Sequence, residues 1–380
     1  MDRLSCLLCG ENALENCMPE GWEPVGVSSD VKLFPEAPPV HVCRKCGHVQ
    51  QLRTAKWDQD VSGIYDNYSV YVLAGADDHQ VFTPEGQGVS RAQTVAWRIA
   101  EQLRLPESGR LLDFGCGSGN FLQAFNRVRP GWELHGYDIN HHYASRIKSL
   151  PAVAGFHSSI AGMLTSFDLI TLNDVVEHLQ DPVSELRTLQ SLLTPEGRIF
   201  SRCPDYTANP FDLIVVDHAS HFAPHSTAEL LGLSELNPVV EANHWFPRVT
   251  AFCARSGATR AWPGTDRSDM DLPRRCLRWL KELPEFFLKK ADSRELGVFG
   301  AAIAGLWVAA MLKPAVTFFL DEDPARCGGE LNGLPIFSGA QIPRNAAVLL
   351  AFPPPMARAI QERFAPTHSG IEFILPPEME

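Results

Sequence analysis

The segment LLDFGCGSGNFL, Leu111–Leu122, joins an apolar run to three closely spaced glycines. The apolar run predicts a buried strand, and the residues that follow the glycines predict a helix. A strand, a glycine loop and a helix in this order are typical of an α/β unit that holds a nucleotide-like ligand at the loop. The residues around the loop indicate which kind of ligand it holds.

The glycine spacing differs from that of dinucleotide-binding proteins. Those proteins use G-x-G-x-x-G, in which the third glycine lets the helix pack closely while its amino end faces a pyrophosphate. Here Gly115, Gly117 and Gly119 alternate with single residues, and Asp113 precedes them. A carboxylate at this place repels a pyrophosphate, but it can receive the ammonium group of S-adenosylmethionine, directly or through water. A site for NAD or another nucleotide is the alternative.

A second acidic residue supports this interpretation. Asp138, in the segment GYDIN, ends the next predicted strand, where a carboxylate can accept hydrogen bonds from both hydroxyls of a ribose. In order and separation, LLDFGCGSG and GYDIN resemble the first two signatures of the class I S-adenosylmethionine-dependent methyltransferases. The resemblance implies a cofactor site that includes Asp113, Gly115, Gly117, Gly119, Asp138 and Ile139.

The same resemblance extends to LITLNDVVEHL, which occupies the place of the fourth strand and its exit loop. It implies that Asn173 and Asp174 lie beside the sulfur end of the cofactor and that His178 lies near the cavity. Glu177 and His178 have two interpretations, as ordinary residues of a loop and helix start or as catalytic groups.

Strand-like and helix-like segments alternate on both sides of this unit. The alternation in 89–255 predicts a parallel, doubly wound α/β sheet, with its ligand at the carboxyl ends of the strands. A polar stretch at about 256–274 separates this core from a smaller Rossmann-like alternation. We therefore expect three parts, at 1–88, 89–255 and 256–380. The uncharged run 296–312 fits a buried strand, turn and helix better than a membrane span, because it is short and contains three glycines.

The first part contains two cysteine pairs with metal-ligand spacing. Each C-x2-C pair places two thiolates on a tight turn, and two such turns complete a closed tetrahedral zinc site. The long loop between the pairs is acceptable, since the entropy of loop closure rises slowly with length. We expect a structural Zn²⁺, with redox pairs or unliganded thiols as the alternative. The expected ligands are Cys6, Cys9, Cys43 and Cys46.

Composition restricts the class of protein. Hydrophobic residues make up 45% of the 380 residues and charged residues 21%, as in soluble globular proteins. The net charge of −12 argues against nucleic acid or an anionic membrane as a partner. Because the N-terminal residues carry no export signal, we expect a cytoplasmic protein whose ten cysteines are thiols or metal ligands. The oligomeric state is not indicated.

The order of the parts resembles the zinc-containing C-methyltransferases that act on nucleotide-linked keto-deoxysugars. YDNYSVY resembles the connector of that family, in which tyrosines close over cofactor and substrate, so Tyr68 joins the expected cofactor site. FLDEDPARCGGELNGLPIF resembles a pattern of the terminal domain. The resemblance implies that this domain, with Gly300, Gly305 and Asp321, holds the nucleotide or sugar part of the substrate; a docking domain is the alternative.

The chemical signature of that family is only partly kept. In FDLIVVDHASHF, Val215 replaces a tyrosine, Asp217 a glutamate and His221 a second tyrosine, whereas His218 matches the family histidine. The Gly-Gly-Ser of the family near HWFPRVTAF and the lysine of its terminal glycine loop are also absent. The resemblance therefore covers the architecture better than the substrate.

Methylation of carbon requires an enolate, and a histidine near neutral pKa suits the removal of the proton. We expect His218 to be this base, Asp217 to orient its ring and His221 to donate to the developing oxyanion. A catalytic metal held by His218, His221 and His225 with Asp217 is one alternative, and structural histidines are another.

The expected function is methylation of carbon on a nucleotide-linked or similarly activated small molecule, with S-adenosylmethionine as methyl donor. Methylation of oxygen or nitrogen, with His178 or His218 as the base, is a second hypothesis. A non-catalytic protein that binds the cofactor or a nucleotide is a third.

Overall fold

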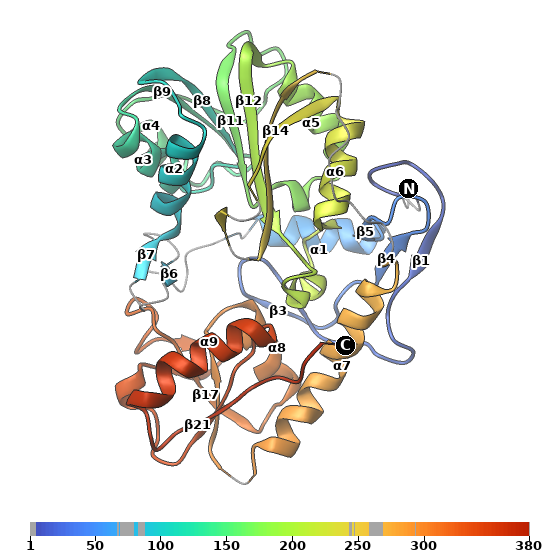
Figure 1. Cartoon of the computed structure of the whole chain (residues 1–380), viewed down its shortest axis with the longest axis vertical. Helices are drawn as coiled ribbons and strands as arrows, with labels where there is room; N and C mark the ends of the chain where they lie inside the picture. The colour runs from blue at the N-terminus through green and yellow to red at the C-terminus, as the bar shows by residue number, and fades with distance from the viewer. Residues whose placement is uncertain are drawn as a thin grey trace.

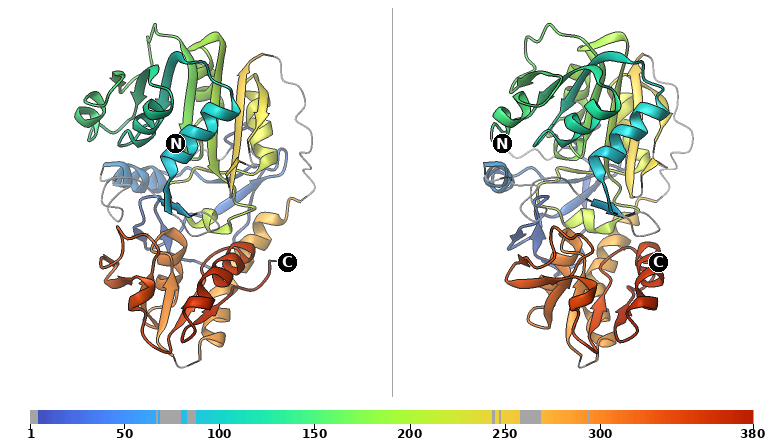
Figure 2. Two further views of the ribbon diagram at one scale, coloured as in Figure 1. Left: turned by 60° about the vertical axis from the view of Figure 1, so that its left-hand side comes forward. Right: turned by 90° about the vertical axis from the view of Figure 1, so that its left-hand side faces the viewer.

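A computed structural model describes residues 5–66, 68, 80–82, 88–242, 245–246, 248–257, 269–292 and 294–379. Figures 1 and 2 show the central sheet with its helices, the N-terminal strands beside it and the C-terminal unit below. Most of the predicted connector after Tyr68 and of the polar stretch 256–274 lies outside the described residues.

The central sheet has seven strands in the order β10-β9-β8-β11-β12-β15-β14. The neighbours from β10 to β12 are parallel, as predicted. β15 is antiparallel to both of its neighbours, so the predicted all-parallel sheet is corrected to a mixed one. The reason is the short link between β14 and β15, which has no room for a crossover helix. The strands are β8 Ser108–Phe114, β9 Gly131–Tyr137, β10 Val153–His157, β11 Phe167–Asn173, β12 Leu193–Pro204, β14 Leu236–Glu241 and β15 Val249–Ser256.

Helices cover both faces of this sheet (Figure 1). α2 (Arg91–Gln102), α3 (Asn120–Val128) and α4 (Ala144–Lys148) contribute to one apolar cluster, and α5 (Pro182–Gln190) and α6 (Pro224–Leu233) to another. α5 begins as its sequence predicts, because the Asp181 carboxylate accepts a hydrogen bond from the Ser184 amide at 3.2 Å and Pro182 occupies the first turn.

The N-terminal strands are continuous with the central part. The sheet β1-β4-β5-β13 joins three N-terminal strands to β13 (Ser220–His221), which follows the central β12 in the chain. Two short helical turns, η1 (Val176–His178) and η2 (Pro210–Ile214), lie next to this junction. The N-terminal elements are β1 Leu14–Asn16, β2 Gly26–Val27, β3 Leu33–Phe34, β4 Val40–Cys43, β5 Val49–Gln51, α1 Ala55–Asp66, β6 Gln80–Phe82 and β7 Gly88–Ser90.

The C-terminal unit has six strands in the order β18-β19-β17-β16-β20-β21, preceded by the long helix α7 (Leu272–Lys290). The predicted alternation is present, and 296–312 forms β16, a turn and α8. No helix in the described residues combines the length and the apolar character that crossing a bilayer requires. The elements are β16 Leu296–Phe299, α8 Ile303–Met311, β17 Val316–Leu320, β18 Glu330–Leu331, β19 Leu334–Phe337, η4 Gly339–Gln341, β20 Ala347–Leu349, α9 Pro354–Phe364, η5 Ala365–Thr367 and β21 Glu372–Ile374.

One apolar core connects the N-terminal and C-terminal parts. Val27, Phe211 and Leu280 belong to the same buried cluster as Trp307, although they come from β2, η2, α7 and α8. The indole Nε1 of Trp307 donates a hydrogen bond to the backbone oxygen of Val25 at 3.1 Å. The C-terminal unit is therefore packed against the N-terminal strands through a buried apolar interface.

Candidate functional site

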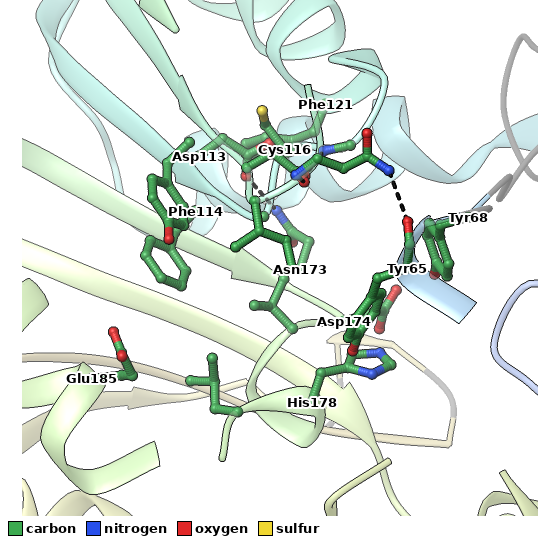
Figure 3. A pocket seen from close by; sticks show the side chains of 18 of the residues that line it. Tyr65, Tyr68, Asp113, Phe114, Cys116, Phe121, Asn173, Asp174, His178 and Glu185 are labelled. Carbon is green, nitrogen blue, oxygen red and sulfur yellow. Dashed lines mark hydrogen bonds between the residues drawn. The ribbon is translucent and has the colours of Figure 1, made fainter. Parts of the chain in front are cut away.

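A cavity of about 930 Å³ lies at the carboxyl ends of the parallel strands β8, β9, β11 and β12 (Figure 3). Side chains from α1 and the start of α2 complete the wall of the cavity. The carboxyl ends of the strands are where an open α/β sheet binds ligands. Of the sequence-predicted site residues, the cavity is lined by Tyr68, Asp113, Gly115, Gly117, Asp138, Ile139, Asn173, Asp174 and His178.

The three glycines of the loop have positive φ angles, which residues with a side chain adopt only at a cost in free energy. Gly115 has φ +78°, and a Cβ there would lie 2.5 Å from Cγ2 of Val175. Gly117 has φ +51° and no atom within 4 Å of an added Cβ, so its Cα faces open space in the cavity wall. The first glycine allows the loop to pass Val175, and the second leaves room for a ligand. Gly119 does not line the cavity; it caps the start of α3.

Asp113 is almost completely buried at the end of β8. Its Oδ1 accepts hydrogen bonds from the Thr171 hydroxyl at 2.7 Å and from the Asn173 amide at 3.3 Å. Burial raises the pKa of this carboxyl to about 7, although both hydrogen bonds favour the charged form. A cation that binds beside it therefore gains most from the carboxylate above neutral pH.

Asp138 connects the glycine loop to the end of β9. One carboxylate oxygen accepts from the Gly117 amide and the other from the Asn140 amide, each at 2.8 Å. Burial raises the pKa of Asp138. Each oxygen retains a second lone pair, so the carboxylate can hold the loop in place and still accept hydrogen bonds from a ligand.

Asp174 follows β11 with φ +56° and forms the centre of an ion-pair group on the cavity wall. Its Oδ1 lies 3.0 Å from a guanidinium nitrogen of Arg202, and its Oδ2 lies 3.1 Å from one of Arg91. Both arginines line the cavity, and neither was singled out in the sequence. The long-range pairing of β11 with β12 brings Asp174 and Arg202 together, and no local motif indicates it.

His178 is the cavity-lining imidazole (Figure 3). Its Nδ1 lies 2.9 Å from the backbone oxygen of Asp217; because a carbonyl can only accept, this nitrogen carries the proton. The other nitrogen, Nε2, then has a lone pair. Burial and the neighbouring His218 lower the pKa of His178, so the ring is neutral at pH 7.

Glu177 lies next to His178 in the chain and is 1% exposed. Neither carboxyl oxygen has a hydrogen-bond partner in the part of the chain that the structure describes, and burial raises the pKa of Glu177 to about 8. The carboxyl is within 4.8 Å of ring nitrogens of His178 and His218. It is therefore a protonated buried acid at neutral pH, behind the cavity wall.

The histidine signature differs from the sequence prediction in two respects. His218 is buried and is not among the described residues that line the cavity; its ring packs edge-on against His178, with 4.8 Å between centroids. Its ring is oriented by Asp212, not by Asp217 as predicted, since Oδ1 of Asp212 lies 2.7 Å from its Nδ1. The apolar segment FDLIVV is typical of a strand, but its first four residues belong to the short helix η2, which turns Asp212 toward the histidines.

Asp212 binds a second imidazole as well. Its Oδ2 lies 2.8 Å from Nδ1 of His221, a fully buried ring that does not line the cavity in the described structure. Burial lowers the pKa of His218, but the Asp212 carboxylate outweighs it and raises that pKa to about 9. The same contacts hold the pKa of Asp212 below its usual value, although burial opposes them. His218 is thus already protonated at pH 7.

The alternative metal site is also corrected. Nε2 of His225 lies 3.1 Å from the backbone oxygen of Gly47, and the candidate metal groups of the described residues contain neither His225 nor Asp217. The described histidine groups are Glu177 with His178 and His218, and Asp212 with His218 and His221. In the second group the carboxylate already bonds to both rings.

The N-terminal part contacts the cavity from the side of α1. The side-chain amide of Asn140 donates a hydrogen bond to the backbone oxygen of Tyr65 at 3.1 Å, drawn as a dashed line beside Tyr65 in Figure 3. Ser29 donates to both oxygens of Asp217, from its amide at 2.8 Å and its hydroxyl at 2.6 Å, and that hydroxyl is 3.1 Å from the Tyr68 hydroxyl. Asp217 therefore connects the N-terminal part to the loop that holds His178.

The four predicted zinc ligands are brought together. Sγ of Cys6 lies 3.5 Å from that of Cys46, Sγ of Cys9 lies 3.6 Å from that of Cys43, and all four are within 4.8 Å of one another. A tetrahedral Zn–S₄ site with bonds of about 2.3 Å has sulfur–sulfur edges of about 3.8 Å, and disulfide sulfurs are about 2.05 Å apart. The cluster fits the metal and not a pair of disulfides.

In the C-terminal unit, Asp321, which was expected to face a nucleotide, bonds to groups of the same unit. Asp321 accepts from the Ala301 amide at 2.8 Å and pairs with Arg326 at 3.3 Å. Gly300 has φ +91°, and a Cβ on Gly305 would lie 1.9 Å from the Gly300 oxygen, so both glycines serve the close packing of the loop on α8.

Comparisons with known proteins agree on the central part. Residues 90–257 match a family model described as a methyltransferase domain. A ubiquinone biosynthesis O-methyltransferase of Xanthomonas campestris pv. campestris is 29% identical over 140 residues, which cover 34% of this chain and 57% of the relative. The enzyme of the same name from Ralstonia nicotianae is 28% identical over 148 residues, covering 33% and 58%. The chain thus spans little more than half the length of these curated relatives.

Two solved structures resemble part of the chain at low sequence identity. The 1,6-didemethyltoxoflavin-N1-methyltransferase of Burkholderia thailandensis is 15% identical with a TM-score of 0.39, covering 56% of this chain and 97% of its own. An S-adenosylmethionine-dependent methyltransferase from Clostridium acetobutylicum is 12% identical with a TM-score of 0.37, covering 53% and 99%.

Proposed function

We propose that this chain transfers a methyl group from S-adenosylmethionine to a small-molecule acceptor, because residues 90–257 match a family model described as a methyltransferase domain. The observation that carries the proposal is the pair of buried carboxylates, Asp113 and Asp138, on either side of the glycine loop in one cavity. Asp113 faces the ammonium end of the cofactor, and Asp138 accepts its ribose hydroxyls.

We assign the base to His178, and not to His218 as the sequence suggested. His178 lines the cavity and is neutral, whereas His218 is protonated and lies behind it. Nε2 of His178 takes a proton from the acceptor, whose electron pair then forms the new bond to the methyl carbon as the carbon–sulfur bond breaks. The products are the methylated acceptor, S-adenosylhomocysteine and a protonated His178. Alignment of acceptor, methyl and sulfur contributes much of the rate.

The finer proposal is that the acceptor is a carbon of a nucleotide-linked, sugar-like molecule. Its support is the combination of the cysteine cluster, the methyltransferase domain and the Rossmann-like C-terminal unit. The second candidate is methylation of oxygen, which the similarity to the ubiquinone O-methyltransferases favours. Incubation with ¹³C-methyl cofactor distinguishes them, since carbon-bound and oxygen-bound methyl groups have separate NMR shifts.

We also propose that the four cysteines bind a structural Zn²⁺. Its place supports this role, because three of these cysteines pack in one apolar cluster with Phe222 and residues of α6. With all four positions filled by thiolates the metal supplies cross-linking and no catalysis.

The proposal is tested by screening nucleotide sugars and other small molecules for stabilisation of the complex with S-adenosylhomocysteine. An acceptor found in this way should be methylated by the wild-type protein and not by His178→Asn. Binding of the acceptor without any transfer by the wild type would refute the enzyme and leave a binding protein.

A further inference from the structure

In the ion-pair group on the cavity wall, two arginines contact one carboxylate. Arg91 and Arg202 share the single carboxylate of Asp174, one on each oxygen. Arg53, the third arginine of the cavity, differs because it pairs one-to-one with Asp58 at 2.7 Å.

Arg202 is the more unusual member of this group. Arg202 is only 7% exposed, and among the described residues its buried Nε has no hydrogen-bond partner. Within the described part of the chain, Asp174 provides the only ion pair of this guanidinium. Burial lowers the pKa of Arg202, and the carboxylate of Asp174 opposes that shift. Buried charges are normally fully paired, so a further anion is expected at this position.

The orientation of Arg202 is fixed before any ligand binds. Its guanidinium carbon lies 5.5 Å from the ring centre of Phe246, which covers one face of the group. Asp174 holds one nitrogen, and the pairing of β11 with β12 holds the backbone. A planar guanidinium held in this way can bind a carboxylate or a phosphate through its edge.

The position of Arg202 relative to the cofactor site decides which molecule brings the anion. Asp113 is on β8 and Asp138 follows β9, whereas Arg202 is on β12, two strands beyond β8. At about 4.8 Å per strand, this is about 10 Å from the strand of Asp113. Arg202 therefore lies on the acceptor side of the cavity.

We propose that Arg202, held by Asp174, binds a carboxylate or phosphate group of the methyl acceptor. The inference rests on the proposed function and narrows the substrate class to anionic small molecules. Neutral acceptors are disfavoured because they leave the guanidinium uncompensated.

The test uses the full-length protein saturated with S-adenosylhomocysteine, at constant ionic strength. Inorganic phosphate and acetate are titrated separately by calorimetry, so that the two arms distinguish phosphate from carboxylate. We expect the wild type to bind at least one of these anions, and we expect Arg202→Met to lower the affinity for that anion at least tenfold. Arg202→Lys keeps the charge but not the planar guanidinium that can form two parallel hydrogen bonds, so it should show an intermediate affinity. Arg53→Met should bind the anion like the wild type.

Two results would overturn the inference. Equal anion binding by Arg202→Met and the wild type would place the anion elsewhere. Loss of affinity for S-adenosylhomocysteine in Arg202→Met, with unchanged affinity for 5′-methylthioadenosine, would assign Arg202 to the carboxylate of the cofactor. Failure of the wild type to bind S-adenosylhomocysteine would instead refute the proposed function, so the two failures are distinguishable.

Discussion

The Nδ1 atom of His178 donates a hydrogen bond to the backbone oxygen of Asp217 over 2.9 Å. This contact fixes the tautomer and directs the lone pair of Nε2 away from the Asp217 loop. A residue of the central domain is thus oriented by a loop that Ser29, of the N-terminal part, holds in place. The base depends on contacts between parts that lie far apart in the chain.

His178→Asn should lower kcat by about 10² to 10⁴, the usual contribution of a general base, with unchanged affinity for S-adenosylhomocysteine. Asparagine keeps a donor for the Asp217 oxygen but cannot accept the proton. The matched control is His142→Asn, an exposed histidine outside the 930 Å³ cavity. Turnover is measured once an acceptor is known, and full activity of His178→Asn would assign the base elsewhere.

Affinity for S-adenosylhomocysteine should rise as pH increases from 6 to 8. The pKa of Asp113 is about 7 because of burial, so its carboxylate forms over this range and attracts the ammonium group of the ligand. Below that pKa the affinity should fall by up to about tenfold per pH unit. Calorimetry across pH measures this, and 5′-methylthioadenosine, which lacks the ammonium, should show no such trend. The trend should also disappear in Asp113→Asn; its persistence there would exclude Asp113 as its cause.

Asp212→Asn should destabilise the protein by about 3–5 kcal/mol at neutral pH, because it removes the partner of a buried charged imidazole. His218 has its pKa raised from 6.5 to about 9, so the stability it contributes is complete below pH 6.5 and is lost as pH rises through about 9. The difference in free energy of unfolding between wild type and Asp212→Asn should therefore shrink above pH 9. Urea unfolding at several pH values measures it, with the exposed Glu196→Gln as control. A difference that does not change with pH would exclude the charged pair.

Purified protein should contain about one zinc per chain, and Cys46→Ser should lose it and unfold at lower temperature. Cys327→Ser is the control, because this cysteine lies in the C-terminal unit, outside the cluster. Metal analysis and thermal unfolding measure both effects. Wild-type protein without metal, prepared without chelators, would refute the site.

The cofactor loop could be predicted from the sequence because its signals are local. Asp113 and Asp138 each lie at the end of a predicted strand, and the glycines lie within five residues of one another. The cysteine pairs are equally local, and the structure gathers them within 4.8 Å.

The residues that sequence analysis missed depend on contacts between distant segments. Arg202 reaches Asp174 only because β12 pairs with β11. Asp212 was hidden because FDLIVV looks like a strand, and tertiary packing makes it the turn η2, which places its carboxylate between two histidines. The pairing of β13 with β5, which joins the N-terminal part to the central one, has no signal in either short segment.

Calorimetric titration of S-adenosylhomocysteine into the full-length protein tests the central claim most directly. The account predicts saturable binding at one site, weakened at least tenfold in Asp138→Asn, because that carboxylate holds both the loop and the ribose. No binding of S-adenosylhomocysteine, together with saturation of the same protein by a nicotinamide dinucleotide, would contradict it.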